Sequence, residues 1–77
     1  MREAYKGFVI NPAPLPLAEG GWNLQVYIEK HRDSDVTMRQ FSAGNIYETE
    51  QEAIKNCLIF GKQIIDGKAG ILSVSDL

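Results

Sequence analysis

The sequence predicts an α+β domain in which a three-stranded antiparallel sheet carries one long helix on one face, in the order β-β-β-α. Residues 22–30 alternate apolar and polar side chains, which is the period of a half-buried strand. Residues 50–66 instead repeat apolar side chains at helical spacing behind a capping signal. Because the β-rich segments all precede the helix, we expect a meander, with all 77 residues in a single domain.

The first strand is expected over residues 5–11, which read Tyr-Lys-Gly-Phe-Val-Ile-Asn. Prolines follow at positions 12, 14 and 16. A proline cannot donate a hydrogen bond to a sheet, so the strand should end there or run along an edge. The run Glu19-Gly20-Gly21 is then typical of a turn.

The second strand, over residues 22–30, is the clearest element of the sheet. Its alternation predicts one face made of Trp22, Leu24, Val26 and Ile28, and another made of Asn23, Gln25, Tyr27 and Glu29.

A third strand is expected over residues 36–42 as its hairpin partner, followed by a loop over residues 42–45. Its parity stays open, because Val36 and Met38 favour one face and Phe41 the other unless a bulge intervenes.

The helix is expected over residues 50–66. Thr49 and Glu52 form a capping box at its start, and Gly67 suits a left-handed stop. Gly61 lies at the centre of the apolar face, where it would let the helix approach the sheet closely, whereas Ile59 lies outside that face. The face comprises Ala53, Ile54, Cys57, Leu58, Phe60, Gly61, Ile64 and Ile65. The tail, residues 70–77, is apolar enough to dock or to pair as a short strand.

Charge and cysteine content exclude several functional classes. Eight Lys and Arg against ten Asp and Glu give a net charge of −2, which argues against a dedicated nucleic-acid binder. Cys57 is the only cysteine, so neither an intrachain disulfide nor a cysteine-based zinc site can form. No apolar run approaches the ~18 residues of a membrane span, and no signal-peptide pattern is present. These features predict a protein of a reducing, cytoplasmic compartment with no membrane contact.

No catalytic constellation is evident. Cys57 lies on the apolar helix face, where a thiol stays protonated and inert. His31 sits in a polar turn beside Arg32 and Asp33, and no serine has an obvious base. Phosphate-binding glycine spacing is also missing. We therefore expect no enzyme activity, no cofactor, no metal and no small-molecule ligand.

The face of the sheet away from the helix is expected to be the contact surface. If Phe8 and Ile10 face the helix, the alternation points other large side chains outward: Tyr5, Val9, Tyr27 and, without a bulge, Phe41. The tail, a second copy in a homodimer or another protein could cover them, or the tyrosines could simply lie in water. The sequence thus predicts a non-enzymatic binding or regulatory module that acts through protein–protein contact.

The alternative function is DNA binding by the sheet. Gly21-Trp22, the alternating strand and the run Thr49-Glu50-Gln51-Glu52-Ala53 resemble the AP2-type and integrase arm-binding domains, which lay a three-stranded sheet in the major groove. The resemblance implies a nucleic-acid face carried by Lys6, Lys30, Arg32 and Arg39. The central strand departs from that pattern, because it offers Gln25, Tyr27 and Glu29 where arginines would be expected.

A second resemblance covers most of the chain. The segments Tyr5-Lys6-Gly7-Phe8, Gly21-Trp22, Glu52-Ala53 and Gly61-Lys62-Gln63-Ile64-Ile65-Asp66-Gly67 are similar to those of small single-domain bacterial proteins of unknown function. This resemblance implies the same fold and a bacterial origin, and it implies no activity.

Overall fold

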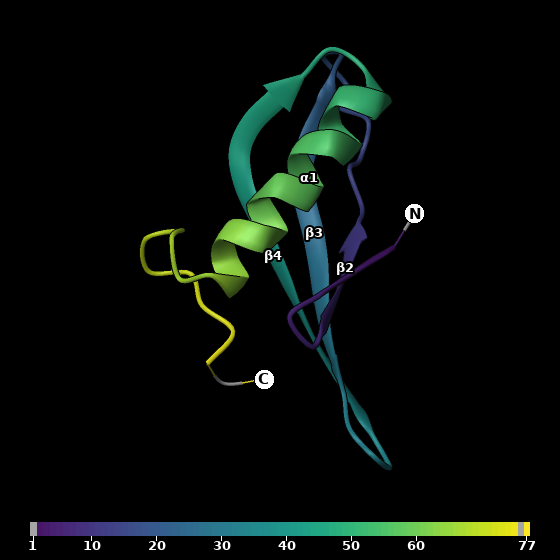
Figure 1. The fold of residues 1–77 in the computed structure, drawn as a ribbon. Coiled ribbons are helices and arrows are strands. Elements are labelled where there is room, and N and C mark those ends of the chain that lie inside the picture. The colour runs from purple at the N-terminus through teal and green to yellow at the C-terminus, as the bar shows by residue number, and fades with distance from the viewer. Residues whose placement is uncertain (1, 76) are drawn as a thin grey trace.

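The computed structural model of the chain describes residues 2–75 and 77, which form an antiparallel sheet with one helix packed on one face (Figure 1). The elements are β1 (Glu3–Tyr5), β2 (Phe8–Pro12), β3 (Trp22–His31), β4 (Val36–Tyr47) and α1 (Glu50–Ile65). The strands lie in the order β1-β2-β3-β4, and every neighbouring pair is antiparallel. The predicted α+β fold is confirmed, with four strands rather than three.

The additional strand arises because the chain turns within the predicted first strand, residues 5–11, so that Glu3–Tyr5 and Phe8–Pro12 form a hairpin. Tyr5 pairs with Phe8, so Lys6 and Gly7 make a two-residue turn. Both have positive φ, 50° and 85°, which is typical of the type I′ turn that suits twisted strands. Lysine rarely adopts this conformation, so the turn carries no strong sequence signal. The turn brings Tyr5 onto the same face as Phe8.

Strand β4 is longer than predicted, and the expected loop at residues 42–45 is wrong. Leu24 pairs with Ala43, but Asn23 pairs with Ile46, so Gly44 and Asn45 form an irregularity within a continuing strand. Beyond this point β4 curves toward the start of α1 (Figure 1). Glycine and asparagine favour turns, which is why the sequence pattern indicated a loop.

The sequence left open which face of the sheet Val36, Met38 and Phe41 occupy. Residues 36–42 pair with β3 without a bulge, and the register of this pairing decides it. Phe41 pairs with Val26 and is buried on the helix side of the sheet. Val36 pairs with His31 and Met38 with Glu29, so both apolar side chains lie on the outer face.

The core lies between the sheet and α1, which packs mainly on β2 and β3. Gly61 faces Ile10 so closely that a Cβ atom there would lie 2.7 Å from Ile10 Cγ2, which confirms the predicted close approach. Trp22 was expected in this layer, but it is only partly buried and lies outside the core cluster. The buried apolar residues are Ile10, Leu24, Val26, Ile28, Phe41, Ala53, Cys57 and Ile64.

The helix begins at Glu50 as predicted and ends at Ile65, one residue before the predicted end at Asp66, which is the C-cap. Thr49 Oγ1 accepts a hydrogen bond from the Glu52 N–H at 3.1 Å. Gly67 has a φ of 75°, and the N–H groups of Gly67 and Lys68 donate to the carbonyls of Ile64 and Gln63. This is a Schellman motif, which satisfies two carbonyls that the helix leaves unpaired.

The tail docks beside the end of α1 and does not form a strand (Figure 1). Leu72, Val74 and Leu77 pack against the core cluster, whereas Ile71 is 99% exposed. Part of the tail prediction, residue 76, lies outside the described residues. The docked tail follows the helix side, so it leaves the outer face of the sheet open.

Among the described residues, no helix has both the length and the apolar content that crossing a bilayer requires.

Candidate protein-interaction surface

The structure brings together only half of the residues predicted for the outer face. Val9 pairs with Glu29, so it shares the outer face with Tyr27 and Glu29. The prediction that Tyr5 and Phe41 lie there is wrong. Tyr5 turns toward the helix through the β1–β2 hairpin, and its hydroxyl donates to Asp66 Oδ2 at 2.8 Å. Phe41 is a core residue because the register of the β3–β4 pairing places it opposite Val26, so Val36 and Met38 face outward instead.

Val36 and Met38 take the place of those two aromatic residues. Their exposed fractions are 53% and 58%. Tyr27 pairs with Gln40, and Glu29 pairs with Met38, so Tyr27 and Met38 are diagonal neighbours on one face. We call the four residues Val9, Tyr27, Val36 and Met38 the outer patch. The sequence of β4 shows that Val36 and Met38 share one face and that Phe41 lies on the other. Only the pairing with β3 shows which of the two faces points outward.

A polar cluster around Glu29 occupies the part of the outer face nearer β1. Glu29 Oε1 accepts from Arg2 Nη2 at 2.8 Å and lies 2.8 Å from His31 Nε2. Asn11 Nδ2 donates to the other carboxylate oxygen. The Glu29 side chain is only 12% exposed. The hydrogen-bonded Glu29 therefore lies between Val9 on β2 and Met38 on β4, and the exposed apolar part of the outer patch is the part on β4.

The four basic residues predicted for nucleic-acid contact are not on the outer face. Lys30 Nζ lies 4.7 Å from the centroid of the Phe8 ring, and Arg39 lies 5.4 Å from that of Phe41. Both rings belong to the helix side of the sheet.

The other two basic residues lie near turns. Lys6 donates to Asp66 Oδ1 at 2.6 Å at the end of α1. Arg32, at the tip of the β3–β4 hairpin, donates to Thr37 Oγ1 at 2.9 Å. The structure therefore does not place these four side chains beside Tyr27, as a DNA-binding outer face would need.

Charged side chains fasten the β1–β2 hairpin to the end of α1. Asp66 accepts from both Tyr5 and Lys6, and Lys62 Nζ lies 2.6 Å from Glu3 Oε2. The hydrogen bonds from Lys6 and Tyr5 lower the pKa of Asp66. The same contacts raise the pKa of Tyr5 and of Lys6, because both donate to a carboxylate. All these groups have partners, so we assign the cluster a structural role.

Cys57 is fully buried, and its thiol donates to the Gln25 carbonyl at 3.0 Å. Burial raises the pKa of this thiol, which keeps it protonated. Within residues 2–75 and 77, no three His, Cys, Asp or Glu side chains gather as a metal site would require.

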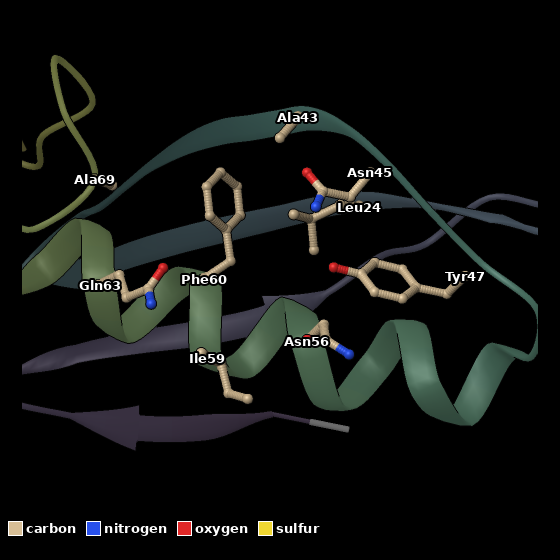
Figure 2. A pocket seen from close by; sticks show the side chains of 9 residues that line it. All are labelled: Leu24, Ala43, Asn45, Tyr47, Asn56, Ile59, Phe60, Gln63 and Ala69. Carbon is tan, nitrogen blue, oxygen red and sulfur yellow. The ribbon is translucent and has the colours of Figure 1, made fainter.

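A groove of about 340 Å³ runs between α1 and β4 on the helix side (Figure 2). Phe60 rises from the helix toward β4, while Tyr47 reaches back from the curved end of β4 (Figure 2). Sequence reasoning missed this groove, although Ile59, the apolar residue outside the helix face, lies beside it. The lining consists of Leu24, Ala43, Asn45, Tyr47, Asn56, Ile59, Phe60, Gln63 and Ala69.

The chain matches no protein family, no curated protein and no solved structure. The two resemblances drawn from the sequence therefore stay predictions, and the functional argument rests on these surfaces.

Proposed function

We propose that the chain is a non-enzymatic binding or regulatory module of the bacterial cytoplasm, and that it acts through protein–protein contact at the outer patch. The observation that carries this proposal is the pair Val36 and Met38, each more than half exposed, with Tyr27 as a diagonal neighbour of Met38. Neither the helix nor the docked tail covers this face in the described residues. Neighbouring exposed apolar side chains, such as Val36 and Met38 on one side of β4, are typical of interaction sites.

The chemistry of the face suits a protein partner. Fully burying a Val or Met side chain contributes roughly 1.5–3 kcal/mol of free energy, so covering Val36 and Met38 would stabilise a complex with a partner. Tyr27 adds a ring whose hydroxyl keeps a polar partner, and such residues are enriched in interfaces. The polar cluster around Glu29 supplies a rim whose hydrogen bonds are already made.

A second copy of the chain is the first partner to test. A two-fold axis through the outer patch brings Met38 and Tyr27 of both copies onto one apolar surface, and two-fold dimers are the commonest homo-oligomers. Each copy neutralises its Glu29 with its own Arg2, so the two facing surfaces carry no uncompensated charge at that point.

Sedimentation at tens of micromolar tests this with three proteins: the wild type, Met38→Glu and Ile71→Glu. Ile71 is the matched control because it is apolar and 99% exposed but lies in the tail. The wild type and the control should sediment as dimers and Met38→Glu as a monomer, since a buried unpaired carboxylate is costly. If the wild type is a monomer, the same three proteins are immobilised and used to capture binding partners from a cell extract. There, a partner retained by wild type and control but lost by Met38→Glu supports the proposal, and identical captures overturn it.

A titration with random duplex DNA at low salt separates this proposal from the alternative. Tight binding that weakens steeply as salt rises, and that Lys30→Glu reduces, would favour nucleic acid over protein as the partner. We expect no such binding, because Lys30 and Arg39 lie on the helix side of the sheet, while Lys6 and Arg32 lie at turns.

A further inference from the structure

We propose that the free edge of β4 and the groove between β4 and α1 form a second binding site, which takes an extended peptide segment with a basic first residue and uncharged side chains in the groove. The segment would add to the sheet as a fifth strand and place an apolar side chain between Phe60 and Tyr47. This site uses the helix side of β4, so it goes beyond the contact proposed for the outer patch.

The first argument comes from the backbone of β4. This strand of 12 residues ends the sheet, and in the described chain no strand pairs with its far edge. It contains no proline and only one charged residue, Arg39, and its one irregularity lies at Gly44-Asn45, so the stretch from Val36 to Ala43 has few of the features that protect an edge. From Val36 to Ala43 the pairing with β3 is regular, so the N–H and C=O groups of the free edge alternate along this stretch. The natural partner for such an edge is another extended chain.

The second argument is the position of the groove. The close contact of Gly61 with Ile10 holds α1 near β2, which leaves the helix side of β4 open. Ala43, Asn45 and Tyr47 line that side from the strand. In an added strand every second side chain points to the same side, next to these residues. Ala43 is the smallest of the three, so it leaves room above the sheet.

The third argument is the chemistry of the lining, none of which is charged. Phe60 and the Tyr47 ring give the groove an apolar part between its three amide side chains, and this part suits an aliphatic or aromatic side chain. A charged side chain would lose its hydration there without gaining a partner. The amides of Asn45, Asn56 and Gln63 can donate to and accept from peptide groups. A volume of about 340 Å³ accommodates one or two side chains, at the lower end of the range for ligand sites.

Charge near the groove indicates how the segment is oriented. β4 runs toward the start of α1, so an antiparallel segment begins beside Tyr47 and proceeds toward Phe41. Glu48 and Glu50, both exposed, follow Tyr47 directly. A lysine or arginine at the first position of the segment would complement these carboxylates.

Panning a phage library of random peptides about 10 residues long against the wild-type protein provides the ligand. The selected peptides should alternate apolar residues and begin with a basic one. N-methylation then tests the strand pairing, because only every second amide of an added strand faces β4. Methylating one alternate set should raise the Kd at least about tenfold, while the other set should change it less than about twofold. Equal effects of both sets would overturn the pairing.

A matched pair of variants tests the groove itself. Ala43→Phe fills the groove and should weaken binding at least about tenfold. Ser42→Phe introduces the same ring at the adjacent residue, which faces the opposite side, and should leave the Kd within about twofold. Met38→Glu should also leave peptide binding unchanged, which separates this site from the outer patch. Wild-type affinity in folded Ala43→Phe, or no selected peptide, would overturn the proposal.

Discussion

β1 and β4 form the two edges of the same sheet, and they differ in length, charge and partners. β1 has three residues, and its hairpin is fastened to the helix by Glu3–Lys62 and by the Tyr5 and Lys6 contacts with Asp66. β4 has 12 residues, one charge and no strand beyond it in the described chain. An edge that is short and held by ion pairs is protected from further pairing, whereas a long neutral edge is a template for it.

The placement of α1 explains why the edges differ. Gly61 lets the helix axis come close to Ile10 in β2, so the last turn of the helix is within reach of β1. Lys62 and Asp66 then meet Glu3, Tyr5 and Lys6. The same shift leaves the opposite side of the helix with a groove over β4. The contact between Gly61 and Ile10 thus brings α1 close enough to β1 for ion pairs to form, and it leaves β4 with a groove beside it.

The largest expected effect is that of Gly61→Ala. The new methyl group would collide with Ile10, and overpacking of this kind costs about 1–3 kcal/mol, against a gain in helix propensity of up to ~1 kcal/mol. The free energy of unfolding in urea should therefore fall. Gly44→Ala is the matched control in β4, where the methyl group meets nothing within 4 Å. Equal changes in the two variants would show that the helix is not held by this contact.

Gly7→Ala should have the next largest effect, because it strains the turn that makes β1. Gly7 has a φ of 85°, and an L-residue in the left-handed region loses about 1–2 kcal/mol. We expect a loss of stability of about that size and faster amide exchange in β1. Exchange in β4 should stay as in the wild type. Faster exchange in both strands would mean that the two edges do not behave independently.

Asp66 should make the β1 edge sensitive to acid. Its pKa is lowered in the folded state, so its contribution is complete above about pH 4, the range of an unperturbed carboxyl group. The contribution is lost as pH falls through the lowered folded pKa. Urea unfolding at neutral and acidic pH should show a shallower acid loss in Asp66→Asn than in the wild type. If the free energy of unfolding depends on pH in the same way in both proteins, the contacts of Asp66 do not stabilise the β1 edge.

Met38→Lys should have the smallest effect on the isolated fold. The side chain is 58% exposed, and surface substitutions of this kind usually stay within about 0.5 kcal/mol. Its effect should appear instead in association, as less dimer by sedimentation at the same concentration. A large loss of stability that depends on protein concentration would indicate that β4 is already covered by a second copy.

Local patterns predicted the elements whose signals lie within a few residues of each other. The alternation over residues 22–30 became β3, and Thr49 and Gly67 mark the ends of α1 as expected. Gly61 was assigned to close packing because it sits on the apolar helix face, and the contact with Ile10 confirms it. The predictions for two other segments, the strand over residues 5–11 and the loop over residues 42–45, were wrong. Lys6 is an unusual residue for a type I′ turn, and the Gly44-Asn45 irregularity resembles a loop.

The fold class, the strand period and the helix with its caps could be predicted from the residues alone, because they depend on hydrogen bonds and side-chain spacing within one segment. Which side chains face outward depends instead on how the strands pair. The two-residue turn at Lys6-Gly7 places Tyr5 on the helix side, and the pairing of Val26 with Phe41 places Met38 on the outer face. The physical reason is that side chains alternate with a period of two, so a change of a single residue in turn or register reverses a face. The groove likewise depends on where α1 settles across the sheet, which no local pattern specifies.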